Sequence, residues 1–456
     1  MRWLLDRFRE NADRLAFVHN DRKSTYGDVA AKVEESVRRL HEAGVQAGHK
    51  VVIVGDYSPD VFCLMLAVGL IGGIVIPLTR QSVVEKDVAL SVSGADWTAE
   101  FEAGGLDYEL RREQIPVSNP LLDTFVAKAR PGLVLFSSGS TGTPKGILHD
   151  FEQVAEKFRT ARAPMVAIPF LMIDHFGGVN TILAITSSLG TVVTVDDRSI
   201  ASVCTAIARY GVELLPVTPS FLNMLLMAKA HEQYDLSSIK RITYGTEVMP
   251  QVTLDRVAAA FPGVQLQQTY GLSEVGVLRS QSRPDGSLWV RIGGEGFQTQ
   301  VRDDILWVKS DYRMEGYLNA PSAFDADGWF NTQDRVEVDG DWFRILGRVT
   351  DIINVGGQKV YPVEVEEAIL GLENIEDVAV YGEAHALLGQ IVVAKVRLRE
   401  AESPDSVKRR VRSACLSQLT NFKVPSKVLV SDAEFVSARQ KKTRRADVSE
   451  PAPPQD

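Results

Sequence analysis

The sequence predicts an α/β protein with a large N-terminal domain of layered α/β sheets, which includes a small antiparallel β subdomain, followed by a small, mobile α+β C-terminal domain. Before residue 285, helical patterns alternate with short apolar strand patterns, which is typical of α/β layering. After residue 285, polar and apolar residues alternate as in antiparallel strands. The pattern changes again near residue 348, so we predict domains at residues 1–347 and 348–456.

The first α/β units lie in the N-terminal hundred residues. Residues 25–45 (TYGDVAAKVEESVRRLHEAGV) predict an amphipathic helix that ends at a glycine, and residues 50–55 (KVVIVG) predict the next strand. Residues 61–78 (VFCLMLAVGLIGGIVIPL) are uncharged and just long enough for a membrane span. Because glycines and a proline interrupt them, we predict a buried helix to about Leu70, a Gly-Gly turn and a buried parallel strand over IVIPL. A membrane span is the less favoured alternative.

A second set of α/β units follows. Strand, helix and strand patterns succeed one another over residues 191–217. Two further strands, within residues 237–245 (SSIKRITYG) and 264–271 (VQLQQTYG), end at glycines. Open α/β sheets bind ligands beyond the carboxyl ends of their strands. Gly245 and Gly271 therefore mark a predicted binding edge.

The remaining segments are shorter. Antiparallel strands are predicted within residues 287–347, for example in SLWVRIGG and ILWVKS. The C-terminal domain is predicted to contain a βαβ-like unit, and the acidic, proline-rich end (SEPAPPQD) a disordered tail. The unit comprises a helix at 363–371, strands at 374–382 and 390–398, and a helix at 404–419.

Composition excludes several classes of function. The formal charge is −9 and the pI is about 5.5, which disfavours a nucleic-acid-binding or membrane-surface protein, because both need a basic face. Cys63, Cys204 and Cys415 are too few and too scattered for a disulfide framework or a zinc site. The first residues carry charges every few positions and no apolar leader, so we expect a cytoplasmic protein with no membrane span.

One segment concentrates small polar residues around a single lysine. Residues 133–150 read LVLFSSGSTGTPKGILHD and contain five hydroxyls, three glycines and Lys145. Such a segment is either an ordinary surface turn or a cradle for a polyphosphate, in which backbone N–H groups, hydroxyls and the ammonium hold the anion. The lysine precedes the glycine, so the segment is not a Walker A loop, and the glycine spacing does not fit a dinucleotide fingerprint.

This segment resembles the phosphate-binding signature of the adenylate-forming superfamily, which includes acyl-CoA and aryl-CoA ligases, adenylation domains of peptide synthetases and luciferases. FSSGSTGTPKG matches the motif T-S-G-[ST]-T-G-x-P-K-G almost residue for residue. Four further segments resemble the family's motifs in the same order along the chain, so the resemblance covers nearly all of it. They are TYGLSE (269–274), FNTQDRV (330–336), GRVTDIINVGGQKVYPVEVE (347–366) and EFVSARQKKTRR (434–445).

The resemblance implies that ATP and a carboxylic acid form an acyl-adenylate. Glu274 would bind Mg²⁺, and Lys442 would be the catalytic lysine. Asp334 would bind the ribose hydroxyls, and Arg348 the ribose or a phosphate. Gly245, Thr246 and Glu247 would line the adenine, with Tyr270 stacked on it and Gly271 and Ser273 beside it. The β- and γ-phosphates would be held by Ser137, Ser138, Gly139, Ser140, Thr141, Gly142, Thr143 and Lys145.

The substrate class depends on residues 175–178 (HFGG), which resemble the gate of acyl and aryl ligases. His175 and Phe176, together with Gly271, would face the acid. Relatives that activate amino acids carry an aspartate where this chain has Phe176, so an α-amino acid is disfavoured, because a buried ammonium without a partner is costly. Asp174, one residue earlier, keeps that alternative open. Further pocket candidates are Asn180, Thr218, Ser220 and Val275.

Three residues depart from the family's pattern. Gln333 and Lys441 replace glycines, and Thr350 stands where an aspartate or lysine hinge is usual. Gln333 tolerates a positive φ poorly. Because Lys441 stands next to Lys442, it is the alternative candidate for the catalytic lysine. Rotation about residue 350 would bring the Gly356-Gly357 edge to an incoming thiol.

The expected acceptor is CoA or the phosphopantetheine of a separate carrier protein. Within the same class of enzyme, an amine acceptor would make an amide instead. From another class, a degenerate protein that binds nucleotide without catalysis also fits the sequence.

Overall fold

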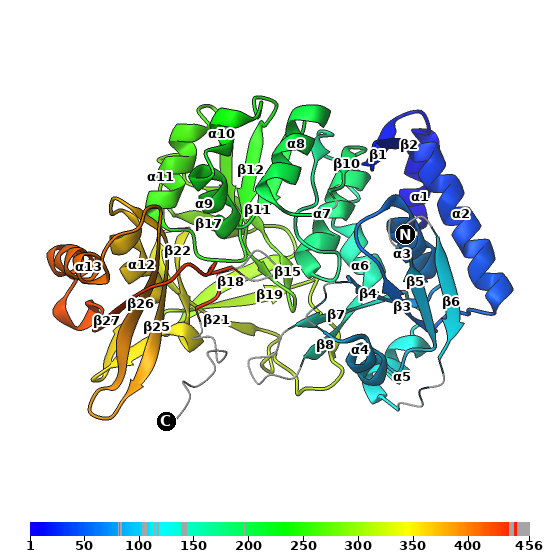
Figure 1. Cartoon of the computed structure of the whole chain (residues 1–456). Helices are drawn as coiled ribbons and strands as arrows, with labels where there is room; N and C mark the ends of the chain where they lie inside the picture. Colours follow the sequence, from blue (N-terminus) through cyan, green and yellow to red (C-terminus); the bar gives the residue numbers. More distant parts are fainter. Residues whose placement is uncertain are drawn as a thin grey trace, which may run out of the picture.

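The computed structural model describes residues 1–80, 82, 84–102, 107–113, 115, 118–137, 144–195, 197–436 and 442–444. Its N-terminal part consists of two α/β sheets and a β subdomain, and a small α+β part lies at one end of the molecule (Figure 1). The predicted fold class is thereby confirmed. Of the helices in the described part of the chain, none combines the length and apolarity that a membrane crossing needs.

The first sheet has seven strands in the order β20-β8-β7-β4-β3-β5-β6. The predicted helix over 25–45 is confirmed as α2, which begins at the N-cap Thr25 and ends at Gly44 in a left-handed conformation. Residues 61–78 form a buried helix and a buried strand, as predicted. The strands are β3 (Lys50–Val54), β4 (Ile74–Leu78), β5 (Trp97–Phe101), β6 (Tyr108–Arg112), β7 (Gly132–Ser137), β8 (Lys145–Asp150) and β20 (Gly316–Tyr317). The helices are α2 (Tyr26–Ala43), α3 (Pro59–Leu70), α4 (Lys86–Ser93), α5 (Pro120–Ala127) and α6 (Phe151–Glu156).

The second sheet also has seven strands, in the order β13-β12-β11-β9-β10-β1-β2, and all pairs except β1–β2 are parallel. Side chains of α3 and α7, such as Phe62 and Val179, share one buried core, so the two sheets are packed together through helices. The strands are β1 (Leu15–His19), β2 (Arg22–Thr25), β9 (Val166–Ala167), β10 (Thr191–Val193), β11 (Leu214–Val217), β12 (Arg241–Tyr244) and β13 (Gln265–Gln268). The helices are α1 (Arg2–Glu10), α7 (Phe176–Ser187), α8 (Ile200–Tyr210), α9 (Pro219–Met227), α10 (Ala230–Gln233) and α11 (Gln251–Ala260).

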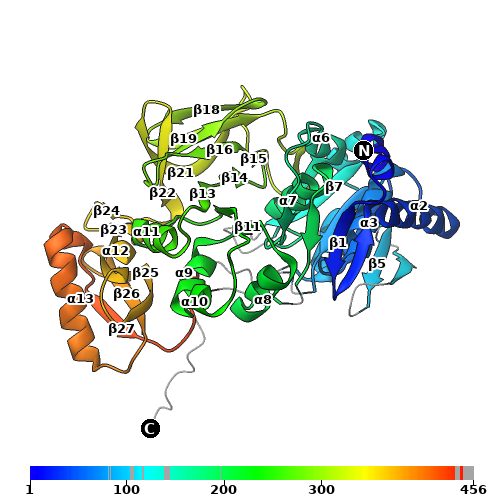
Figure 2. The ribbon, with the colours of Figure 1, turned by 90° about the horizontal axis from the view of Figure 1, so that it is seen from above.

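The antiparallel subdomain is a six-stranded sheet in the order β16-β17-β22-β21-β19-β18, seen beside the second sheet in Figure 2. Alternate residues of β19 are buried, as the sequence pattern predicts. A short ribbon, β14–β15, connects this sheet to β13. The strands are β14 (Gly271–Leu272), β15 (Gly276–Val277), β16 (Arg279–Ser282), β17 (Val290–Gly293), β18 (Phe297–Arg302), β19 (Ile305–Ser310), β21 (Phe330–Asp339) and β22 (Trp342–Arg348).

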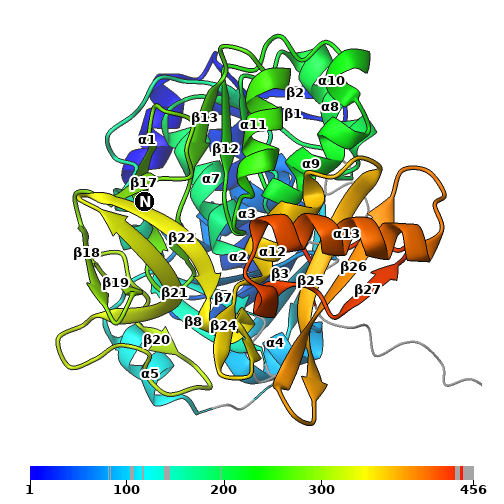
Figure 3. The same ribbon diagram turned by 90° about the vertical axis from the view of Figure 1, so that its left-hand side faces the viewer.

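The C-terminal sheet corrects one prediction. The strands predicted at 374–382 and 390–398 pair antiparallel as a hairpin, because the short link between them cannot carry the crossover that parallel strands need. The βαβ unit is instead formed by β26, α13 and β27, whose strands are parallel (Figure 3). The elements are β23 (Ile353–Val355), β24 (Gln358–Val360), α12 (Pro362–Leu370), β25 (Ile375–His385), β26 (Gly389–Leu398), α13 (Pro404–Gln418) and β27 (Lys427–Val430).

Candidate active site

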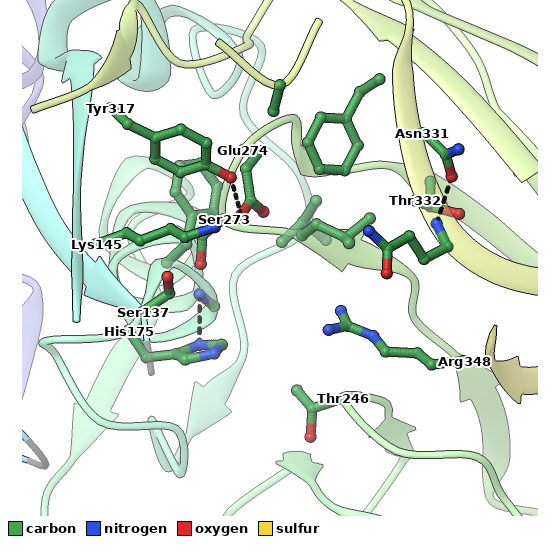
Figure 4. A pocket seen from close by; sticks show the side chains of 18 of the residues that line it. Ser137, Lys145, His175, Thr246, Ser273, Glu274, Tyr317, Asn331, Thr332 and Arg348 are labelled. Carbon is green, nitrogen blue, oxygen red and sulfur yellow. Dashed lines mark hydrogen bonds between the residues drawn. The ribbon is translucent and has the colours of Figure 1, made fainter. Parts of the chain in front are cut away.

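A cavity of about 560 Å³ lies where the first sheet, the carboxyl ends of the second sheet and the antiparallel subdomain meet. Figure 4 shows Lys145, Ser137 and His175 on one side of this cavity and Arg348, Asn331 and Thr332 on the other. Of the predicted site residues that the structure describes, most therefore come together. Of the predicted residues, Ser137, Lys145, His175, Phe176, Thr246, Tyr270, Gly271, Ser273, Glu274 and Arg348 line the cavity.

The predicted phosphate-binding segment is described only at its two ends. Ser138, Gly139, Ser140, Thr141, Gly142 and Thr143 lie outside the described residues. Ser137 ends β7 and Lys145 begins β8, and these two residues are paired in the hairpin. Asn319 fixes the backbone on either side of Lys145. Its side-chain oxygen accepts from the Gly146 N–H at 3.0 Å, and its side-chain amide donates to the Pro144 carbonyl at 2.8 Å.

Lys145 and Glu274 face each other across Tyr317. The Lys145 ammonium lies 5.1 Å from the centre of the Tyr317 ring, and the Tyr317 hydroxyl donates to Glu274 at 2.8 Å. Burial and the nearby Glu274 carboxylate raise the pKa of Tyr317, so this hydroxyl stays protonated and remains a donor. The site thus places one cation and one carboxylate beside the end of the predicted phosphate segment.

Asp334 is the most buried carboxylate at the edge of this site. Its side chain accepts from the Tyr270 hydroxyl at 2.6 Å, and the Arg348 guanidinium lies 3.4 Å away on the paired strand. Burial raises the pKa of Asp334, while Arg348 and Tyr270 act against that rise. Tyr270 packs into the core of the antiparallel subdomain, so its hydroxyl orients Asp334. The stacking of its ring on adenine stays a prediction.

Gln333 occupies a left-handed backbone conformation, with φ of 59°. This agrees with the expectation that the position favours glycine. The backbone N–H groups of Gln333 and Asp334 donate to the side chains of Asn331 and Thr332, which fixes the turn before the aspartate. The Gln333 side chain is exposed and lines the cavity.

The substitution Gln333→Gly is expected to preserve the site. Glycine adopts the same left-handed conformation without the cost of about 1–2 kcal/mol that a non-glycine residue bears there, and its greater freedom in the unfolded state offsets part of this gain. The free energy of unfolding should therefore rise by up to about 1 kcal/mol in denaturant titrations, and ATP affinity should stay within about twofold. A collapse of ATP affinity would instead mean that the glutamine side chain contacts the nucleotide.

The ends of β12 and β13 approach each other too closely for side chains. A Cβ atom on Gly245 would lie 2.4 Å from the Thr269 hydroxyl, so only glycine fits there. Thr246 follows with φ of 69° and lines the cavity. Glu247 accepts from the Ser220 N–H at 3.1 Å and the Ser220 hydroxyl at 2.8 Å, and it also accepts from the backbone N–H of Lys442. Glu247 therefore joins the N-terminal part to the C-terminal part.

The predicted gate begins α7. His175 is the N-cap, and its Nδ1 accepts from the Gly177 N–H at 3.1 Å. Phe176 is buried and packs on His149. Asp174 is buried and hydrogen-bonded to Thr79 at 3.4 Å, and it does not line the cavity. This position gives no support to an aspartate that would pair with a substrate ammonium.

A second cavity of about 510 Å³ continues from the first toward the C-terminal part. Thr246, Tyr270, Gly271 and Arg348 line both. Glu247, Asp334 and Lys442 line the second one only.

The Lys442 ammonium is held within the C-terminal part, 3.0 Å from Asp377 and 2.8 Å from the Val378 carbonyl. Burial acts to lower its pKa, but Asp377 and Glu366 outweigh burial and the pKa is raised, so the lysine is charged.

Several residues of the site carried no recognisable sequence signal. Tyr317 and Asn319 lie in a segment without a motif and reach the site only because β20 pairs with β8. Asn331 and Thr332 lie within the FNTQDRV segment (330–336), but the family resemblance assigns them no role. A search for polar residues beside Asp334 could have found the latter two, whereas β20 required knowledge of the strand pairing.

The fold and the site define an enzyme that activates a carboxylate with ATP. Residues 4–86 and 88–300 match the AMP-binding enzyme family and residues 364–442 match the AMP-binding enzyme C-terminal domain, so the chain belongs to this adenylate-forming family, that of the AMP-forming acid–CoA ligases.

The chain is similar along almost its whole length to known ligases. It is 24% identical over 479 residues to a long-chain-fatty-acid–CoA ligase of Mycobacterium tuberculosis, covering 94% of both chains. It is 25% identical over 482 residues to an indoleacetate–CoA ligase of Aromatoleum aromaticum, covering 94% of this chain and 93% of the relative. An anthranilate–CoA ligase solved with anthranoyl-AMP has the same fold, with a TM-score of 0.83, 18% identity and coverage of 97% and 95%.

Proposed function

We propose that this ligase attacks the α-phosphorus of ATP with the oxygen of a carboxylic acid, which releases pyrophosphate and forms an acyl-adenylate. The thiol of CoA then attacks the acyl carbon, AMP leaves, and a thioester is formed. The observation that carries the proposal is the single cavity in which Lys145, Glu274 and Arg348 converge beside the phosphate segment. Catalysis of such a transfer depends on positioning and charge stabilisation, and these residue types supply both.

The phosphates are assigned to the segment that ends in Lys145. Ser137, the hydroxyls and backbone N–H groups of residues 138–143, and the Lys145 ammonium would bind the β- and γ-phosphates. Mg²⁺ suits Glu274, because its carboxylate lines the cavity opposite Lys145 and oxygen is the ligand that this cation prefers. When bound, the ion would neutralise charge on the phosphates and on the leaving pyrophosphate.

The nucleoside is assigned to the other half of the site. The Asp334 carboxylate would accept both ribose hydroxyls, and its hydrogen bond from Tyr270 supports that role by fixing its orientation. Arg348 would contact the ribose or a phosphate. The adenine would lie along Gly245, Thr246 and Glu247, and Gly271 and Ser273 would complete this wall.

Lys442 is the proposed catalytic lysine, which would bridge the carboxylate and the α-phosphate. Its ammonium would have to exchange Asp377 for the substrate, and its place on the wall of the Asp334 cavity supports this assignment.

The proposed domain boundary lies between residues 347 and 348, and the C-terminal domain would rotate about Thr350. That rotation would bring the Gly356-Gly357 turn to the site, where the absence of side chains would admit a pantetheine arm. His175 would act as the gate between acid and thiol.

CoA is the preferred acceptor because the similar ligases act with CoA. A carrier protein or an amine remains an alternative acceptor for the same adenylate. The cysteines of the chain are buried free thiols, which supports a reducing compartment such as the cytoplasm.

Pyrophosphate release tests the proposal directly. The protein with ATP and Mg²⁺ is given fatty, aryl, short-chain and amino acids, first alone and then with CoA. We expect release with one class of acid, and faster release with a thioester product when CoA is present. Release that CoA does not accelerate would transfer the assignment to a carrier protein or an amine. ATP binding without release for any acid would identify the degenerate nucleotide-binding protein.

A further inference from the structure

A third cavity, of about 390 Å³, adjoins the active site and is strongly basic. Thr269 and Val277 line both this cavity and the first one, so the two are separated only by shared walls. Four cationic side chains line it, and no aspartate or glutamate is among its described lining residues. The four are Lys157, Arg162, Arg241 and Arg279.

Lys157 is the cation of this cluster with the least access to solvent. Its ammonium donates to the Asn180 carbonyl oxygen at 3.0 Å and to the Val277 backbone carbonyl. The rings of Phe158 and Phe297 lie 5.4 Å and 5.7 Å away. Within the described part of the chain, no carboxylate pairs with this lysine. Two neutral acceptors and two rings therefore surround a positive charge.

The arginines increase the imbalance of charge. Burial, together with like-charge repulsion from Arg162 and Arg279, lowers the pKa of Lys157 to about 7. Burial also lowers the pKa of Arg162, with Arg279 and Arg241 acting in the same direction. The acidic contact of Arg279 is Glu295, which lies 3.4 Å away and is 82% exposed, so it offers little compensation.

One face of α7 connects this cavity to the proposed site of acid activation. Gly177 lines the first cavity, and Asn180, Thr181 and Ala184 line the basic one. Residues at i, i+3, i+4 and i+7 lie on the same face of a helix. Because each residue of a helix rises about 1.5 Å, Asn180 lies roughly 5 Å further along α7 than Gly177. The Lys157 ammonium, which donates to the Asn180 side-chain oxygen, lies at that level of the helix.

We infer that the acid activated by this enzyme carries a second anionic group, so that one carboxylate is adenylated while the other binds Lys157 and the arginines of the basic cavity. This inference rests on the proposed function and adds the class of substrate to it. Burying a lysine without a counter-ion is costly, and a substrate carboxylate supplies the missing charge and hydrogen-bond acceptor. A simple fatty or aryl acid would leave Lys157 without a carboxylate partner.

Matched pairs of acids test this inference. Pyrophosphate release is measured for benzoate against terephthalate and for hexanoate against adipate. We expect the dicarboxylate of a pair to be preferred in kcat/KM by about tenfold or more, because truncating one partner of a buried charge pair has effects of this size or larger. Lys157→Met should remove most of this preference, whereas Lys157→Arg should retain part of it.

Arg291→Gln is the control, because Arg291 is a half-exposed arginine of the antiparallel subdomain that does not line the basic cavity. Direct binding of each acid, measured as a shift in the unfolding temperature, tests the anion site separately from the proposed ligase activity. Stabilisation by the dicarboxylate that Lys157→Met abolishes would support the anion site even if no tested acid reacts. Equal binding and equal turnover of both members of each pair, unchanged in Lys157→Met, would overturn the inference and leave the ligase assignment intact.

The pH dependence gives a second readout. Lys157 is charged below its pKa of about 7 and loses its proton as the pH rises through that value, beside the guanidinium groups of Arg162, Arg241 and Arg279. Asn180, Phe158 and Phe297, which also face the lysine, do not titrate. The preference for the dicarboxylate should therefore fall several-fold between pH 6.5 and 8.5. A preference that is independent of pH in the wild type and lost equally in Arg291→Gln would contradict a role for Lys157.

Discussion

Replacing Lys442 with alanine should lower the rate of acyl-adenylate formation by a factor on the order of 10²–10³, while ATP affinity changes by less than about threefold. A lysine that meets the charge developing in the transition state contributes to the rate rather than to ground-state binding. Single-turnover formation of the adenylate and calorimetric titration with ATP measure the two quantities. The variant also leaves Asp377 without its 3.0 Å partner, so its thermal unfolding has to be recorded alongside.

Lys441→Ala is the control, and it resolves a choice that the sequence leaves open. Both lysines are followed by an arginine three residues later, so the motif fits either register. The Lys442 ammonium is held by Asp377 and the Val378 carbonyl, and Arg444 makes two 2.8 Å bonds to the buried Glu366. If Lys441→Ala is the inactive variant and Lys442→Ala only lowers stability, Lys442 holds the end of the chain in place and Lys441 is the catalytic residue.

Replacing Asp334 with asparagine should raise the Kd for ATP by about tenfold to a hundredfold. The amide keeps the size of the side chain but loses the charge, and one of its two terminal atoms no longer accepts from a ribose hydroxyl. Because burial raises the pKa of this carboxylate, the folded protein gains little from its charge, and the unfolding free energy should change by less than about 1 kcal/mol. Calorimetric titration with ATP and denaturant unfolding measure the two effects.

Asp304→Asn is the matched control for this variant. Asp304 is an exposed aspartate of the same subdomain, paired with Arg335 at 2.6 Å, and it does not line either active-site cavity. It should leave ATP binding unchanged. An Asp334→Asn protein that binds ATP as tightly as the wild type would remove Asp334 from the nucleotide site.

The sequence predicted local structure well where a local pattern determines it. Gly72 and Gly73 correctly separated α3 from β4, because breaking a helix is a property of the residues themselves. The antiparallel pairing of β25 with β26 was not predicted, because the pattern of a single strand does not show which strand it pairs with or in which direction. β20 was missed because a two-residue strand has no periodicity, although it brings Tyr317 to Glu274.

The prediction of the site shows the same division. Asp334, Glu274 and Lys145 were found because each lies in a motif, and the structure brings all three to two adjoining cavities. Lys157 and Arg279 were overlooked, because a single charged residue in a sequence is read as a solvated one. Only the packing of α6, α7 and β16 around one cavity distinguishes them from ordinary surface residues.

The position of Glu247 has a consequence for the timing of the two half-reactions. One carboxylate accepts hydrogen bonds from Ser220 at the start of α9 and from the backbone of Lys442. Rotation of the C-terminal domain would break the second contact, but the first would keep Glu247 oriented and ready to receive Lys442 again. The residue would then act as a reversible latch, and the lifetime of that latch would set how often the enzyme alternates between making the adenylate and consuming it.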